Sequence, residues 1–380
     1  MEFNLSAAQE AYRKKVLEFA AGAELDKNLA ELDARGEFNL RAWKLCAEFG
    51  IQGGLISKEF GGQGLELVTY IAGLEALGEA CSDNGLLVAM CAQIFACELP
   101  IAAFGSAEQK KKWLPALCSG GKIAAIAIAE EQGASDAFSL QTVAARRDGG
   151  YVINGRKCFI TNAPFCDMVL VFARLEHSAK DVVCLVVDAS NPGLKRLPPT
   201  KKMGLRSGPF GELVLDNCVV PEESRLGSET SGKLVFMAAM EWERGCLLAP
   251  IVGAMQRQLE QCIKRVRERK QGGQSISRFQ AVSHRIVDMK MRVELARMML
   301  HNFAWKKQTR RRANLEASMT KLYISESFVQ NTLDAMQLHG GYGYTCDSGV
   351  ERQLRDAVAT RIASGTSDVQ KNIIAEWLRL

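Results

Sequence analysis

Residues 142–154, TVAARRDGGYVIN, carry the clearest hairpin signal of the 380-residue chain. Asp148-Gly149-Gly150 separates two short runs of strand-forming residues, Thr142–Arg146 and Tyr151–Asn154. An Asp-Gly pair favours the tight turns that join antiparallel strands. We therefore predict a β-hairpin here, inside a larger region of β structure.

Strand signals continue on both sides of this hairpin, over residues 121–226. The short apolar or β-branched runs are Lys122–Ala129, Met168–Ala173, Val182–Val187, Glu212–Leu215 and Cys218–Val220. Proline and glycine clusters separate them, as is typical of strands joined by turns. The pattern predicts a middle β domain of residues 121–226.

Residues 1–120 show helical periodicity instead and predict an N-terminal helical domain. Ser6 is a candidate N-cap for the first helix. Asn84–Phe104 is almost wholly apolar, which is typical of a helix buried on most sides, and Pro100 should end or kink it.

Residues 227–380 return to helical periodicity and predict a C-terminal helical bundle. Long helices are expected over Leu234–Lys270, Arg278–Gln308 and Leu315–Leu338, and Pro250 should kink or split the first. The order helix, β, helix predicts a mainly α fold with a central β domain (α+β). It argues against a doubly wound nucleotide-binding fold.

Composition narrows the function classes. Hydrophobic residues make up 47% and charged residues 24%, as in an ordinary globular protein. No charge-free apolar run reaches about 18 residues, and MEFNLSAAQEAYRKK lacks a secretory apolar core, so we expect no membrane span and a cytoplasmic location. The twelve cysteines have no C-x-x-C spacing and predict free thiols, and the four histidines form no cluster, so no metal site is expected.

The formal charge is +5, with basic runs at Lys110-Lys111-Lys112 and Arg310-Arg311-Arg312. Such runs indicate either solvated helix faces or a docking surface for an acidic partner. No aromatic residues interleave with them, so nucleic acid is not an expected partner.

Met240-Glu241-Trp242-Glu243-Arg244 is the most informative local feature. On one continuous helix, Phe236, Met240, Glu243, Leu247 and Pro250 would share a face that is apolar except for Glu243. Burial there would raise the pKa of the carboxyl and make it a candidate base. A residue at the edge of the stripe, or one partner of a core ion pair, would give the same pattern.

Two glycine-containing segments lie further along the chain. His339–Tyr344 permits either a structural turn or a close backbone approach to a ligand. Gly365-Thr366-Ser367 precedes Val369–Leu378 and predicts a helix start with hydroxyl caps, where a phosphate could also bind.

Several ordered motifs together resemble the acyl-CoA dehydrogenase family over nearly the whole chain. They are FGGQGL (60–65), EEQGASD (130–136), FITN (159–162), Arg269 with Gln280, QLHGG (337–341), RD (355–356) and GTS (365–367). The resemblance implies an N-terminal helical domain, a middle β-barrel and a C-terminal four-helix bundle. It also implies FAD, a homotetramer and a flavin site completed by a second subunit.

The same resemblance assigns roles by position. The implied cofactor-binding residues are Ala129, Ser135, Phe159, Thr161, Arg269, Gln280, Gln337, Gly341, Thr366 and Asp368. Arg269 and Gln280 would reach the FAD of a neighbouring subunit, with Gln337, Gly341 and Thr366 completing that pocket. Ala129 stands where the family has a hydroxyl residue, and Glu131 and Gly272 replace the usual proline and phenylalanine, so flavin affinity or potential should differ from the family norm.

The position of the catalytic base decides the subgroup. Many members carry a glutamate just before the C-terminal Gly-Thr, where this chain has Ser364. A minority, including isovaleryl-CoA dehydrogenases, place it on the first long bundle helix, as Glu243-Arg244 does here. The resemblance therefore implies Glu243 as the base, and Trp242, Arg244, Ser364 and Gly365 as substrate-binding residues.

Trp242-Glu243-Arg244 and Ser364–Asp368 look most similar to the corresponding segments of enzymes that oxidise prolyl or related acyl groups on carrier proteins in natural-product pathways. The implied substrate is an acyl thioester on a phosphopantetheine arm. Electrons would pass to an electron-transfer flavoprotein or to oxygen. The alternatives are a short- or branched-chain acyl-CoA dehydrogenase, a flavin oxidase or monooxygenase on the same fold, and a non-catalytic scaffold.

Overall fold

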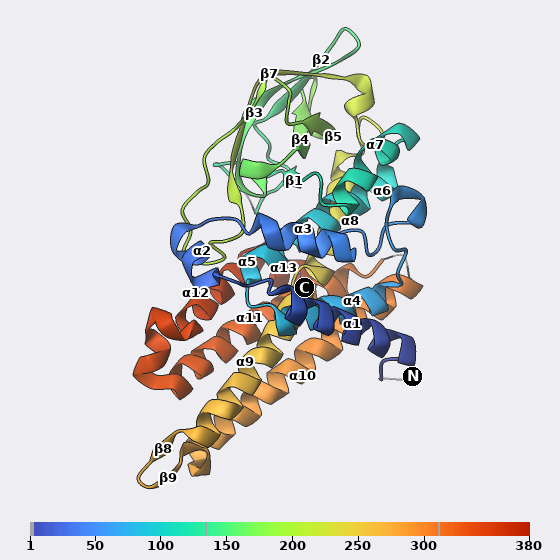
Figure 1. Ribbon diagram of the computed structural model, residues 1–380. Helices are drawn as coiled ribbons and strands as arrows, with labels where there is room; N and C mark the ends of the chain where they lie inside the picture. Colours follow the sequence, from blue (N-terminus) through green and yellow to red (C-terminus); the bar gives the residue numbers. More distant parts are fainter. Residues whose placement is uncertain (1–3, 134, 311) are drawn as a thin grey trace.

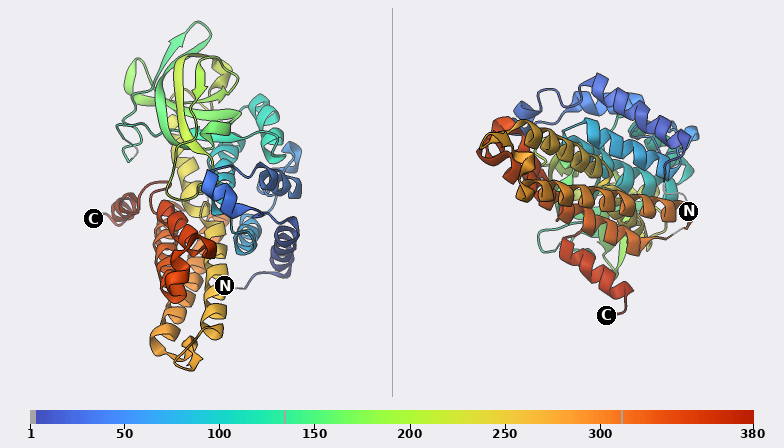
Figure 2. Two further views of the ribbon diagram at one scale, coloured as in Figure 1. Left: turned by 60° about the vertical axis from the view of Figure 1, so that its left-hand side comes forward. Right: turned by 90° about the horizontal axis from the view of Figure 1, so that it is seen from below.

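The computed structural model describes residues 4–133, 135–310 and 312–380 (Figure 1). Ala134 of the predicted flavin segment, Arg311 of the predicted basic run and the first three residues of the N-terminal segment lie outside the described residues. A β domain stands at one end of the molecule, and the long C-terminal helices extend away from it (Figures 1 and 2).

Helices form the N-terminal part. They are α1 (Ala7–Ala23), α2 (Leu29–Arg35), α3 (Leu40–Phe49), α4 (Leu67–Ala80), α5 (Asn84–Gln93), α6 (Leu99–Phe104) and α7 (Ala107–Cys118). The predicted cap at Ser6 is confirmed, because its hydroxyl accepts a hydrogen bond from the Gln9 N–H while the Gln9 side chain accepts one from the Ser6 N–H.

The expectation that Pro100 ends its helix is wrong, because the helix continues past it to Phe104. The alternative, a kink at Pro100, stays a prediction. The irregularity lies just before it, in one turn of π-helix over Ile94–Glu98. The segment Asn84–Phe104 is the one described helix long and apolar enough to cross a membrane, and 83% of its most apolar window is buried inside the fold.

The β domain is one seven-stranded sheet. Its strands are β1 (Ala124–Ala127), β2 (Val143–Arg147), β3 (Gly150–Thr161), β4 (Met168–Leu175), β5 (Ser178–Asp188), β6 (Leu194–Arg196) and β7 (Phe210–Pro221). The order is β1-β4-β2-β3-β7-β6, with β5 paired to β4. The predicted hairpin is confirmed, since β2 and β3 pair antiparallel from Val143↔Asn154 to Arg147↔Gly150.

The two runs Glu212–Leu215 and Cys218–Val220 belong to the single strand β7. Between them, Asn217 adopts a φ of 47° beside a register shift, and the chain then returns to its pairing with β3. Asn tolerates this left-handed conformation, so the strand bends without ending.

The C-terminal part is helical, as predicted. Its helices are α8 (Gly232–Cys246), α9 (Ala249–Glu268), α10 (Gln280–Thr309), α11 (Asn314–His339), α12 (Val350–Thr360) and α13 (Ser367–Trp377), and the hairpin β8 (Lys270–Gln271) and β9 (Gln274–Ser275) joins α9 to α10. The predicted split near Pro250 is confirmed. Leu247 follows Glu243 as the C-cap of α8, with its N–H bonded to the Glu243 carbonyl, but Pro250 belongs to α9, so the predicted five-residue stripe is wrong at Pro250.

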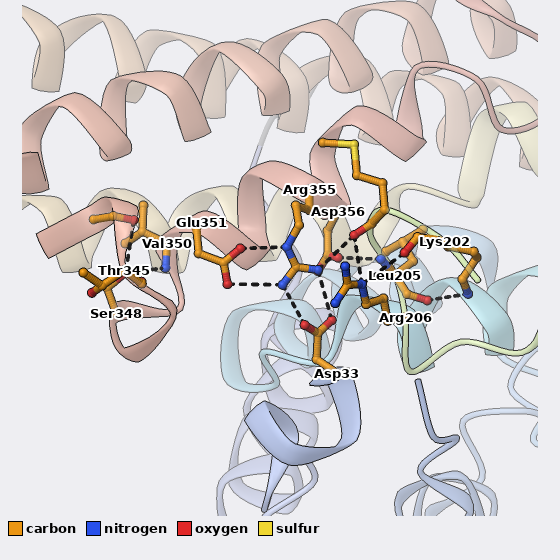
Figure 3. A network of polar contacts seen from close by, with 12 residues as sticks. Asp33, Lys202, Leu205, Arg206, Thr345, Ser348, Val350, Glu351, Arg355 and Asp356 are labelled. Carbon is orange, nitrogen blue, oxygen red and sulfur yellow. Dashed lines mark hydrogen bonds and ion pairs between the residues drawn. The ribbon is translucent and has the colours of Figure 1, made fainter. Parts of the chain in front are cut away.

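A polar joint ties the three parts together (Figure 3). Arg355 on α12 donates hydrogen bonds to Asp33 on α2 at 2.6 Å and to Glu351 at 2.7 Å. Asp356 accepts from the Leu205 N–H at 2.6 Å and from Asn84 at 3.1 Å. The Arg-Asp motif is therefore a structural joint rather than part of a reaction centre.

Candidate active site

Glu243 lies near the end of α8, the helix that runs from the β domain into the bundle (Figure 1). Phe236 and Met240 precede it on the same face, and the Phe236 ring contacts the edge of Phe172 in β4 at 5.6 Å. Glu243 is only 8% exposed. Burial raises the pKa of its carboxyl to about 7, although Ser364 and Arg244 oppose the shift. A carboxyl with this pKa is matched to proton transfer at neutral pH.

The π-helical turn Ile94–Glu98 packs against α8 beside this carboxyl. Cys97 lies close enough that the charge of Glu243 raises the pKa of its thiol, after burial as the larger cause. The same thiol is influenced by Cys166 and Cys184 of the β domain. Glu243 therefore sits where α8, the π-turn and the underside of the sheet meet.

The segment between α12 and α13 brings the predicted substrate residues Ser364 and Gly365 to Glu243. Ser364 has a φ of 56° and Gly365 a φ of 94°, both in the left-handed region. Arg244 donates to the Ser364 carbonyl at 3.3 Å, which ties this segment to α8 next to Glu243. The Ser364 hydroxyl lowers the pKa of Glu243, yet it makes no full hydrogen bond within the part of the chain that the structure describes.

The predicted flavin residues of the β domain lie at the end of β3 and in the segment between β1 and β2, an edge of the domain although β3 is an interior strand of the sheet. Phe159 stands at a register shift in β3 with a φ of 59°, and its ring is 60% exposed. The Cys158 N–H donates to the Ala129 carbonyl at 3.0 Å, so Ala129 and Phe159 are neighbours. Thr161 ends β3, and Ser135 lies on an exposed loop. An exposed aromatic ring on a distorted strand fits a flat ring system as its cover.

A buried ion pair fixes this edge. The Lys157 ammonium donates to Glu130 at 2.7 Å and to the Ile128 carbonyl at 3.0 Å. Glu130 also accepts from the Gln141 N–H at 2.6 Å. The pair thus anchors both ends of the loop that carries Ser135, and it was missed in the sequence because Glu130 and Lys157 are far apart along it.

Three residues with predicted substrate or cofactor roles, Trp242, Thr366 and Asp368, make contacts with other parts of the protein. Trp242 packs under the Lys307 ammonium at 4.7 Å, which places it against α10 rather than on the Glu243 face. Thr366 caps α13, since its hydroxyl accepts from the Val369 N–H at 3.2 Å. Asp368 is exposed and pairs with Lys371. The predicted hydroxyl cap is confirmed, and ligand roles for these three residues stay predictions.

Arg269, Gln280, Gln337 and Gly341 lie far from Glu243. All four are exposed, at the end of the bundle opposite the β domain, where α9 ends, α10 begins and α11 ends (Figure 1). The ion pair of Arg285 with Asp334 at 2.8 Å joins the start of α10 to the last turns of α11. Within one chain these residues cannot reach the edge that carries Phe159.

Comparison with known proteins identifies the family. Residues 6–121 match the N-terminal domain model of the acyl-CoA dehydrogenases, residues 125–218 the middle domain model and residues 230–379 the C-terminal domain model. The chain belongs to the acyl-CoA dehydrogenase family. Membership confirms the predicted fold class and the predicted reaction class, a flavin-dependent dehydrogenation of an acyl thioester.

The chain is similar over its full length to an L-prolyl-(peptidyl-carrier protein) dehydrogenase of Pseudomonas fluorescens. It is 40% identical over 388 residues, covering 100% of both chains. The crystal structure of the prolyl acyl carrier protein oxidase AnaB is 44% identical, with a TM-score of 0.97 over 99% of this chain and 100% of the other. PigA with FAD and proline is 37% identical, with a TM-score of 0.96 and full coverage of both chains.

Two further residues of this dehydrogenase went unnoticed in its sequence. Lys321 on α11 is 1% exposed, and Gln370 on α13 is fully buried, and both donate to carbonyls of the segment that carries Ser364. Lys321 shares the buried face of its helix with Ala317, Ile324 and Phe328. A lysine within an apolar stripe is the same signal that singled out Glu243. Among the described residues, no group of His, Cys, Asp and Glu is arranged to hold a metal ion.

Proposed function

We propose that the protein removes one hydrogen from each of Cα and Cβ of a prolyl or similar small acyl group, tethered as a thioester to a carrier protein. The observation that carries the proposal is Glu243, a buried carboxyl whose pKa is raised to about 7 beside the Ser364–Thr366 segment. The names of the two prolyl-carrier enzymes above support the choice of substrate.

Glu243 takes the α-proton in its ionised form, which is half populated near pH 7. Negative charge then develops on the thioester oxygen and needs fixed donors. The N–H groups of Ser364, Gly365 and Thr366, which donate to no acceptor among the described residues, are the donors that we assign to this oxygen. Bound FAD supplies the acceptor for the hydride that leaves Cβ. Arg244 holds the donor segment through the Ser364 carbonyl and does not transfer protons itself.

The residues present fit FAD. The exposed Phe159 ring and the Thr161 backbone at the distorted end of β3 offer a face and polar groups for a flavin ring. The Lys157–Glu130 pair keeps the adjoining loop in place. Ala129 contributes no hydroxyl, so we expect one flavin contact fewer than in a protein with Ser or Thr there.

The remote group Arg269, Gln280, Gln337 and Gly341 supports a site shared between subunits. These residues are exposed and distant from Phe159 in one chain, which supports a contact with a flavin held by another copy. We propose that the protein works as a homotetramer in which pairs of copies complete each other's flavin sites. Size measurement of the FAD-loaded protein tests this assembly.

Mass spectrometry of carrier-bound acyl groups tests the substrate. The FAD-loaded protein is incubated with a carrier loaded in turn with prolyl, other aminoacyl and short acyl groups, and the same groups are offered as CoA esters. We expect a mass loss of two hydrogens on the prolyl carrier. Desaturation of CoA esters alone would contradict the carrier assignment, and an oxygenated product would indicate a monooxygenase. Hydrogen peroxide release distinguishes oxygen from an electron-transfer flavoprotein as acceptor.

A further inference from the structure

Lys321 projects from α11 into the segment that connects α12 to α13. Its ammonium donates to the Arg361 carbonyl at 3.0 Å and to the Gly365 carbonyl at 2.8 Å, so it bridges the two ends of the segment. The residue is 1% exposed. Burying a lysine is costly unless its charge has a task or a full set of acceptors.

Other donors hold the same segment from the same side. Gln370 donates to the carbonyls of Ser364 and Gly365, each at 3.1 Å, and Arg244 donates to the Ser364 carbonyl. Every carbonyl used is therefore turned toward the protein. The N–H groups of Ser364, Gly365 and Thr366 donate to no acceptor in residues 4–133, 135–310 or 312–380.

Consecutive free N–H groups at residues with left-handed backbone form a concave donor site for an oxygen that carries negative charge. The Ser364 hydroxyl lies close enough to Glu243, the proposed base, to lower the pKa of its carboxyl. A thioester whose oxygen binds at this donor site would therefore have its Cα near that base. We propose that Lys321 is a positioning residue for the reaction. It holds the Arg361–Thr366 segment so that these N–H groups face the thioester oxygen, and its charge polarises the Gly365–Thr366 peptide group, whose N–H is one of the donors.

The charge needed for this role is present at neutral pH. Burial lowers the pKa of Lys321 to about 8, the Glu326 carboxylate opposes the decrease, and Arg244 and Arg361 add to it. The ammonium form therefore still predominates at pH 7. This assignment rests on the proposed function, because it concerns the thioester oxygen of that reaction.

Lys202 provides a matched control within the same chain. Its ammonium also donates to two backbone carbonyls, those of Leu205 at 2.6 Å and of Gly208, and burial likewise lowers its pKa to about 8. The segment that Lys202 holds belongs to the joint between domains (Figure 3). Loss of Lys202 should thus report the purely structural effect of removing a buried lysine clamp.

The test compares K321M, K321Q and K202M in the FAD-loaded protein. The first readout is kcat and KM for carrier-bound prolyl thioester. The second uses a 3-oxoacyl thioester, which forms an enolate without any redox step, and measures the pKa of the bound ligand from its ultraviolet absorbance. K321M should lower kcat about 100-fold with little change in KM. It should also raise the pKa of the bound ligand by at least about one unit, because its enolate loses donors.

K321Q keeps a donor without the charge and should fall between K321M and the wild type, which keeps the test usable if K321M does not fold. K202M should lower the melting temperature and leave the pKa of the bound ligand unchanged. An unchanged ligand pKa in K321Q or K321M, with only a lower melting temperature, would overturn the role of Lys321. A wild-type protein that desaturates no thioester and ionises no 3-oxoacyl ligand would instead overturn the proposed function, and this assignment with it.

Discussion

Two buried glutamates on neighbouring helices, Glu98 and the proposed base Glu243, differ in what surrounds them. Glu98 ends the π-turn and is fully buried, and burial raises its pKa to about 8. Glu243 is 8% exposed, and its pKa is raised to about 7. Cys97 lies close to both. By pKa alone, either could serve a proton transfer near neutral pH.

Their surroundings differ. Glu98 accepts a hydrogen bond from Gln93 at 2.9 Å, and its second oxygen has no partner among the described residues. Gln93 in turn accepts from the Ala124 N–H at 2.8 Å, which links the π-turn to β1. Glu98 is thus sealed inside a helix–sheet contact, whereas Glu243 lies beside Ser364, whose hydroxyl lowers the pKa of its carboxyl. A raised pKa reports burial, and only access to a reacting atom turns it into catalysis.

The largest expected effect comes from E243Q. Removing the base should lower the desaturation rate about 1,000-fold, because a positioned general base contributes roughly that factor. FAD should stay bound, since Glu243 is not among the residues around Phe159. Visible absorbance of the purified variant checks the flavin, and single-turnover flavin bleaching checks the rate. Turnover within tenfold of the wild type would remove Glu243 as the base and end the contrast with Glu98.

E98Q should change stability and leave the rate within about threefold of the wild type, because Glu98 touches no reacting atom. The folded state holds the Glu98 proton up to about pH 8, while the unfolded chain releases it near its usual pKa of 4.5. Wild-type stability from this group therefore falls as pH rises from 4.5 to 8. We compare the unfolding free energy of E98Q with that of the wild type at each pH. The difference, E98Q minus wild type, should be on the order of 3 kcal/mol larger at pH 8 than at pH 5.

Denaturant unfolding of FAD-loaded E98Q and wild type at pH 5 and pH 8 measures this gap. A gap that does not widen would show that Glu98 is ionised in the folded protein. A rate loss as large as that of E243Q would place Glu98 in the reaction after all, and the distinction drawn between the two carboxyls would fail.

The smallest expected effect comes from S364A. The Ser364 hydroxyl lowers the pKa of Glu243, so its loss should raise that pKa further. Because Glu243 acts when ionised, kcat/KM should rise with pH through about 7 in the wild type. In S364A the midpoint of this rise should move upward by about 0.5 to 1 pH unit, because a shift of that size corresponds to the free energy of one hydrogen bond. A pH–rate profile measures the shift, and a downward movement would contradict the assignment.

Much of the fold could be predicted because it depends on short-range patterns. The Asp148-Gly149 turn, the Ser6 cap and the break before Pro250 each follow from local chemistry. Elsewhere the packed structure overrides local preference. The helix continues past Pro100 although proline favours a helix end, and Asn217 bends β7 without ending it because β3 continues to pair.

The candidate site was predicted in part. Glu243 is recognisable because a carboxylate interrupts an apolar helical face, and Ser364 and Gly365 join it as the resemblance implied. The Lys157–Glu130 anchor and the Gln370 contacts join residues through folding alone. No periodicity in the sequence reveals such pairs, since each partner by itself has the pattern of an ordinary polar residue.

The sequence by itself determined the order of the elements, the family, and a carboxylate placed on an apolar face. Tertiary structure alone decided which buried carboxyl can act, because that depends on what surrounds it. Glu243 acquires its raised pKa from burial, and it meets Ser364 in a segment about 120 residues further along the chain. Burial and donor geometry are properties of packed segments, and they do not exist until α8, α11 and α13 come together.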